Sequence, residues 1–138
     1  MGYRANLPFS ASVFDPKEYV NSEGNAECVE FVRQVTKLPH TGLWIPGAQV
    51  KGNPHVPIGT AIAIFDETGS FASKYGGSAH AAIYISQGAL GLVVVDQWKG
   101  QGKVKPHVIW FPEHRTPTKP TRNGDLYRVI ELIQPKLL

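Results

Sequence analysis

The 138-residue sequence has a single cysteine, and it has no apolar run long enough to cross a membrane. One cysteine excludes an intramolecular disulfide and a zinc site built from several thiolates. We therefore expect neither a resident metal nor a cofactor. The N-terminus lacks the apolar stretch and the small-residue cleavage site of a secretory signal peptide. These absences predict a chain that is made in the cytoplasm, with no signal peptide and no membrane span.

The length and composition are those of one globular domain. The sequence is 42% hydrophobic and 18% charged, and no internal repeat or low-complexity segment is visible. A chain of this length buries enough surface to fold without a disulfide or a metal. We therefore predict a single domain over residues 1–138, with its core from about residue 15 to about residue 133.

The net charge is modest, at +3, but it is unevenly distributed. Residues 1–69 carry five Lys and Arg against seven Asp and Glu, whereas residues 70–138 carry nine against four. A basic second half favours contact with an acidic partner or polymer, although a solvated surface without a partner is the simpler explanation. The Lys and Arg residues are dispersed and have no aromatic-basic repeat, so nucleic-acid binding is not expected.

Helical signals come first along the chain and strand signals later, which predicts an α+β fold. A short helix is expected over residues 15–20, and the strongest helical pattern starts with Asn25 as a cap and ends at Lys37. Residues 39–59 are rich in Pro and Gly and are predicted to be irregular, with one helical turn near residues 47–50. Five strands with short connections, which favour antiparallel pairing, are predicted over residues 60–65, 79–85, 91–96, 107–111 and 126–133.

Cys28 lies in the first turn of the strongest predicted helix, on or beside its buried face. The unpaired N–H groups and the dipole at this end of a helix stabilise an anion, which favours the nucleophilic thiolate. The backbone N–H of Cys28 is also placed to stabilise an oxyanion. The alternative interpretation is a small core residue with no chemistry.

A nucleophilic thiolate needs a base, and the sequence offers five histidines. His80 opens an apolar strand directly after a loop of small residues, so it is held rigidly and yet lies within reach of a substrate. A histidine at a strand start is otherwise most often structural. We prefer His80 to the remaining four, which lie in loops or turns or at the start of another strand: His40, His55, His107 and His114.

Asp96 is the candidate for the third residue of a triad, which orients the histidine and stabilises its charged form. It closes the apolar strand 91–96, where a buried carboxylate is costly unless it has a partner. Gln97 is an alternative as a neutral orienting group, and Asp96 is then a turn residue.

Several segments resemble the papain-like cysteine hydrolases of the NlpC/P60 and CHAP type, which have Cys, His and a polar residue in this order. Residues 25–32 (NAECVEFV) resemble their nucleophile helix, residues 59–63 (GTAIA) the strand that follows, and residues 78–84 (SAHAAIY) their histidine strand. The blocks 44–53 and 95–98 resemble, more narrowly, small bacterial proteins of the BPSL0067 type, which are similar to type VI secretion amidase effectors.

The resemblance implies an α+β, papain-like NlpC/P60 (CHAP-like) fold, with N-terminal helices packed on a sheet of roughly five to six antiparallel strands. It implies that Cys28, His80 and Asp96 hydrolyse an amide in the peptide stem or crosslink of bacterial peptidoglycan. It also implies secretion into the periplasm of a target cell, contact with components of the secretion apparatus, and a cognate immunity protein. Candidates for substrate binding are Trp44, Tyr75, Gln97 and Trp98, whose alternative role is that of ordinary core or rim residues.

Other functions fit the same residues. The protein could be a phage-type or housekeeping cell-wall lysin, or a papain-like protease or deamidase that acts on a protein. A non-catalytic binding module, with Cys28 in the core, is the least favoured. An activated thiol reacts rapidly with iodoacetamide at neutral pH and a core thiol does not, so reactivity separates the last possibility from the others.

Overall fold

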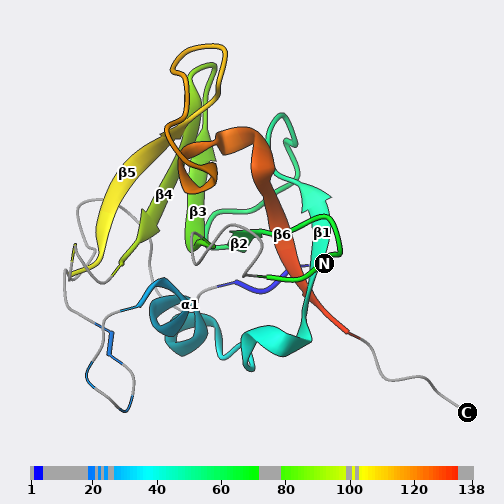
Figure 1. Ribbon diagram of the computed structural model, residues 1–138, viewed down its shortest axis with the longest axis vertical. Helices are drawn as coiled ribbons and strands as arrows, with labels where there is room; N and C mark the ends of the chain where they lie inside the picture. Colours follow the sequence, from blue (N-terminus) through cyan, green and yellow to red (C-terminus); the bar gives the residue numbers. More distant parts are fainter. Residues whose placement is uncertain are drawn as a thin grey trace, which may run out of the picture.

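The computed structural model describes residues 2–4, 19, 20, 22, 24, 27–71, 79–98, 101 and 103–133 (Figure 1). In these residues, one α-helix, α1 (Cys28–Thr36), packs against a single antiparallel sheet of six strands in the order β1-β6-β2-β3-β4-β5. The α+β class and the antiparallel sheet are therefore confirmed, although the described residues contain one α-helix where several were expected. The strands are β1 (Trp44–Gln49), β2 (Ala61–Ile64), β3 (Ala81–Gln87), β4 (Gly91–Asp96), β5 (Lys105–Trp110) and β6 (Tyr127–Leu132).

Strand β1 corrects the prediction of an irregular segment with a helical turn. Its Pro46 lacks a backbone N–H and its Gly47 has little strand propensity, which is why the segment looks irregular in the sequence. Both residues are tolerated because β1 is an edge strand that pairs only with β6, and the pairing is irregular between Pro46 and Gln49. Three 3₁₀ turns also connect the elements: η1 (Thr41–Leu43), η2 (Pro120–Arg122) and η3 (Gly124–Leu126).

The helix α1 begins at Cys28, with Glu27 as its N-cap residue, and so it starts later than predicted. The side chain of Glu27 makes no capping hydrogen bond, and the predicted cap, Asn25, lies outside the described residues. At the other end, Lys37 adopts a left-handed conformation with φ 63°, and its N–H donates to the carbonyl of Arg33. The helix predicted over residues 15–20 also lies outside the described residues, except for two residues without regular structure.

The central strands are buried on both faces, which explains their nearly continuous apolar sequences. In β2, Ala61 and Ala63 belong to the core that includes the buried face of α1, whereas Ile62 and Ile64 belong to a second core on the other face. Small residues on the helix side let α1 approach the sheet closely. Figure 1 shows α1 below the central strands, with β4 and β5 along one side of the sheet and β1 and β6 along the other.

Three element ends that are distant in sequence meet near the start of α1. The pairing of β3 with β4 is antiparallel and places Ile83 opposite Val95, so the beginning of β3 lies beside the end of β4. The helix packs against the same two strands. The residue before β3, the last residue of β4 and the first residue of α1 are thereby brought together. No helix within the described ranges is long and apolar enough to span a membrane.

Candidate active site

The ends of α1, β3 and β4 bring together the three residues predicted to form a triad. Oδ2 of Asp96 lies 2.5 Å from Nε2 of His80. The side chain of Cys28 also interacts with the ring of His80 and raises its pKa. Because Nε2 is engaged by the carboxylate, Nδ1 is the ring nitrogen left for the thiol. His80 therefore bridges the carboxylate and the sulfur, an arrangement suited to a thiolate–imidazolium pair.

The surroundings of His80 favour its charged form. Burial by itself lowers the pKa of His80, because an imidazolium is poorly solvated in the protein interior. The hydrogen bond to Asp96, the interaction with Cys28 and the charges of these two groups outweigh burial and raise the pKa of His80 to about 10 from the ordinary value of 6.5. His80 is therefore protonated at neutral pH and can supply a proton to a leaving amine.

A second histidine, His107 on β5, contacts the other oxygen of Asp96. Its Nδ1 lies 3.1 Å from Oδ1, a close polar contact that does not have the alignment of a hydrogen bond. Asp96 is fully buried, which raises the pKa of its carboxyl, but the interactions with His107 and His80 outweigh burial and hold that pKa below its usual value. The carboxylate thus stays ionised between two imidazoles.

Sequence reasoning considered His107 only as a less favoured base and missed its contact with Asp96. The pairing of β4 with β5 places His107 opposite Val94, and Asp96 opposite Lys105. His107 is therefore diagonal to Asp96, within reach of its carboxylate. Only the register between the two strands reveals this contact, because the sequence around Pro106 does not indicate which residues of β4 and β5 lie opposite each other.

Cys28 and His80 line a cleft of about 700 Å³. One wall is Trp98, which is 39% exposed and whose ring centre lies 6.3 Å from that of His80 and 5.6 Å from that of His107. Trp98 therefore lies at the cleft, beside both histidines. The other described residues that line the cleft come from the start of α1, from the segment between β2 and β3, from β5 and from the segment after β5, and they include Glu27, Val29, Phe71, Trp110, Arg115, Lys119 and Arg122.

Of the other candidates for substrate binding, the structure describes Trp44 and Gln97, and neither lines the cleft. Trp44 is a correction: it is 2% exposed, packs edge-on against Phe71 in the core, and donates its indole N–H to the carbonyl of Pro39. Its place in the middle of the sheet's helix-side core satisfies both its apolar surface and its single donor. Tyr75 lies outside the described residues.

Gln97 is also a correction, because it is fully buried, does not line the cleft, and forms its hydrogen bonds with Tyr19 and Glu27 and not with His80. Its Oε1 accepts a hydrogen bond from the N–H of Tyr19, and its Nε2 donates to the carbonyl oxygens of Tyr19 and Glu27 at 2.6 and 2.8 Å. The amide thus fastens the residue that precedes Cys28 to the end of β4. Gln97 therefore holds the start of α1 and makes no hydrogen bond to His80.

No group of three or more His, Cys, Asp and Glu residues in the described part of the chain is arranged to hold a metal ion. What the site offers is a thiol at a helix start, an imidazole and a carboxylate. The first N–H groups of α1, which have no partner within the helix, lie beside the thiol. Such a set can perform acyl transfer through a covalent thioester.

The described residues thus define the class of protein: an α+β fold that brings together a thiol and an imidazole that line a cleft and a buried carboxylate behind the imidazole. A solved structure named type 6 secretion amidase effector 2 (Tae2) shares this fold. It is 26% identical in sequence, the TM-score is 0.74, and the similarity covers 90% of this chain and 92% of that chain.

Sequence comparisons then identify the family. The sequence model of the family Domesticated amidase effector 2 matches residues 9–130. A Domesticated amidase effector 2 from Ixodes scapularis is 36% identical over 110 residues, which cover 77% of this chain and 71% of that protein. A type VI secretion amidase effector 2 protein of Salmonella typhi is 36% identical over 73 residues, so the match spans about half of each chain, 53% of both. The chain belongs to the Domesticated amidase effector 2 family.

Proposed function

We propose that this protein is a cysteine amidase that hydrolyses an amide bond in the peptide stem or crosslink of bacterial peptidoglycan. The observation that carries the proposal is the bridge that His80 makes between Cys28 and Asp96 at the cleft. The relatives named amidase effectors support the amidase chemistry. The sequence resemblance to NlpC/P60 and CHAP domains supports a papain-like mechanism and the wall peptide as substrate.

The mechanism begins with the Cys28 thiolate, paired with protonated His80, at the carbonyl carbon of the amide. Attack forms a C–S bond and moves the carbonyl electron pair onto oxygen, where the backbone N–H of Cys28 at the helix start can stabilise the oxyanion. Collapse breaks the C–N bond, and the proton of His80 passes to the leaving amine. The products of this half-reaction are a thioester on Cys28 and a free amine.

The second half-reaction regenerates the thiolate. Neutral His80 accepts a proton from water as the water oxygen attacks the thioester carbonyl, and collapse breaks the C–S bond. The thiolate and the imidazolium are restored, and the new carboxylic acid leaves. Asp96 stays ionised throughout and holds the ring of His80 by its Nε2 atom, so that Nδ1 faces the sulfur.

The same proposal includes a biological setting. The names of the relatives favour an antibacterial effector that is secreted by a type VI apparatus and acts in the periplasm of a target cell. An enzyme that attacks a polymer shared by producer and target requires protection of the producer, and a cognate immunity protein that blocks the cleft would supply it.

The test is digestion of purified peptidoglycan and of soluble muropeptides, followed by mass spectrometry of the products. The expected result is a new amine and a new carboxylate at one amide bond, with the mass of one water added. Cys28→Ala is the matched control and should leave the fold intact and abolish cleavage. If the wild-type chain cleaves no wall peptide, or if Cys28→Ala cleaves at a similar rate, the proposal is wrong. Cleavage of protein substrates alone would favour a protease or deamidase.

A further inference from the structure

We propose that Arg115, Lys119 and Arg122 form a subsite of the catalytic cleft that binds a free carboxylate of the substrate. This inference rests on the proposed function, which it extends by naming the charge that the substrate carries beside the scissile amide. All three side chains are exposed and line the same cleft as Cys28.

The three cations are not paired with a carboxylate in the described part of the chain. Among the described residues, no carboxylate lies within ion-pair distance of any of them. The described lining of the cleft contains a single carboxylate residue, Glu27, beside the thiol. The cleft wall therefore carries an excess of positive charge that an anionic ligand can neutralise.

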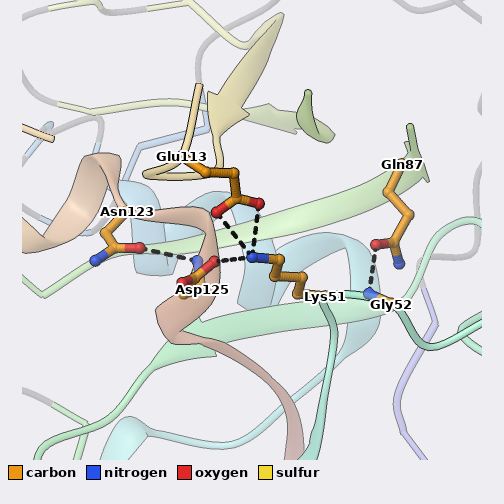
Figure 2. A network of polar contacts seen from close by, with 6 residues as sticks. All are labelled: Lys51, Gly52, Gln87, Glu113, Asn123 and Asp125. Atoms are coloured by element: carbon orange, nitrogen blue, oxygen red, sulfur yellow. Dashed lines mark hydrogen bonds and ion pairs between the residues drawn. The ribbon is translucent and has the colours of Figure 1, made fainter. Parts of the chain in front are cut away.

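The acidic residues of the same segment are held elsewhere. The segment 111–126, which we call the basic segment, contains two carboxylates, Glu113 and Asp125. Figure 2 shows both of them on the ammonium group of Lys51, with Glu113 Oε1 at 2.9 Å and Asp125 Oδ1 at 2.8 Å from Nζ. The contact with Asp125 and the hydrogen bonds that Lys51 donates to Glu113 raise the pKa of Lys51, so it stays charged. The folding of the segment thus separates its charges, with the carboxylates bound to Lys51 and the cations on the cleft.

The basic segment is also held in place by the core, so its cations are presented on a firm support. The hydroxyl of Tyr127, which is fully buried, donates to the carbonyl of Thr121 at 2.7 Å. Gly124 packs so closely on β5 that an added Cβ would lie 2.9 Å from the carbonyl oxygen of Ile109. Asn123 accepts a hydrogen bond from the N–H of Asp125, which closes the turn (Figure 2).

Arg115 has the geometry of an anion-binding residue. Its guanidinium lies over the ring of Trp110, 5.8 Å from the ring centre. A cation–π contact does not engage the guanidinium N–H groups with a hydrogen-bond acceptor oxygen, so these groups can bind a carboxylate through two hydrogen bonds. Lys119 is the N-cap residue of the turn η2, and Arg122 is the last residue of that turn. A ligand carboxylate therefore meets two guanidinium groups and one ammonium group.

The first experiment uses the single thiol as a reporter and compares two alkylating reagents of similar size that differ in charge. Iodoacetate carries a carboxylate and iodoacetamide does not, and both alkylate Cys28. We expect the ratio of the iodoacetate rate to the iodoacetamide rate to fall about two- to threefold for each of Arg115→Gln, Lys119→Gln and Arg122→Gln at low salt. It should fall about tenfold for the triple variant, and the difference should shrink in high salt. The iodoacetamide rate itself should stay nearly constant, because the fold and the triad are intact.

The matched control is Lys37→Asn. It removes one positive charge at the far end of α1, about 13 Å from Cys28 along the helix. Asn tolerates the left-handed conformation of residue 37, so this variant should fold and keep the wild-type ratio. An unchanged ratio in the triple variant, or an equal fall in Lys37→Asn, would overturn the subsite.

The second experiment compares wall peptides whose carboxylates are free with the same peptides amidated at these groups. The triple variant should raise KM about tenfold for the free form and leave the amidated form unaffected. If both forms are hydrolysed alike by the wild type although the alkylation ratio shifts, the cations serve an acidic partner and the assignment to substrate is overturned. If no wall peptide is cleaved but the ratio shifts, the proposed function fails and the carboxylate subsite stands.

Discussion

Replacing Asp96 by Asn tests whether the buried carboxylate sustains the charged histidine. The pKa of His80 is raised from 6.5 to about 10. The difference corresponds to about 5 kcal/mol in favour of the imidazolium, at about 1.4 kcal/mol for each unit. The hydrogen bond to Asp96 is the largest contribution that raises this pKa, while burial opposes it and persists in the variant. We therefore expect the pKa of His80 to fall to about its ordinary value or below, so that about a tenth of the protein carries an imidazolium at pH 7.5.

The assay is the rate of Cys28 alkylation by iodoacetamide as a function of pH, which needs no substrate and reports on one thiol. The wild-type rate should stay high and nearly level across neutral pH. In Asp96→Asn it should fall about tenfold at pH 7.5, with a profile that changes near the new pKa of His80. Hydrolysis should fall by about 10- to 10⁴-fold, as for an orienting carboxylate. A folded Asp96→Asn variant with the wild-type pH profile would refute the reasoning, because a group other than Asp96 would then stabilise the charged form of His80.

Three further substitutions test the supports of the site. Gln97→Leu leaves buried backbone groups of Tyr19 and Glu27 without partners and should lower the free energy of unfolding by about 2–4 kcal/mol. The control Gln34→Leu changes an exposed side chain and should cost under about 1 kcal/mol in the same denaturation assay. Equal costs would contradict a stabilising role for the buried hydrogen bonds of Gln97. Because the pKa of His80 is higher in the folded state, its contribution to stability is full below about pH 6.5 and is lost as the pH rises through about 10. The free energies of unfolding of the wild type and of His80→Gln should therefore converge over that pH range. A difference between them that stays constant with pH would contradict this prediction. Gly124→Ala should push the basic segment off β5 and lower the ratio of the iodoacetate to the iodoacetamide alkylation rate. An unchanged ratio would show that this close contact does not position the cations.

The local pattern of the sequence determined much of the fold. Apolar runs separated by turn residues located β2 to β6 with small errors at their ends. The runs are clearest in β2, β3 and β4, which are largely buried and so have few polar positions. The pattern failed at β1, where Pro46 and Gly47 oppose strand structure and only pairing with β6 at the sheet edge overrides them. It also started α1 too early, because the capping preference of Asn25 says nothing about the tertiary contacts of Glu27.

For the site, the sequence by itself determined which chemistry is available: one thiol at a helix start, a histidine that opens an apolar strand, and a carboxylate that ends the next strand. These three are predictable because each has a local signature and because consecutive antiparallel strands bring such ends together. Only the tertiary structure decided three other placements. These are the burial of Gln97 and Trp44 in the core, the contact of His107 with Asp96, and the position of three cations on the cleft. Each depends on strand register or on a contact across many residues of chain, and the energy of such contacts comes from burial and from charge pairing that no local pattern encodes.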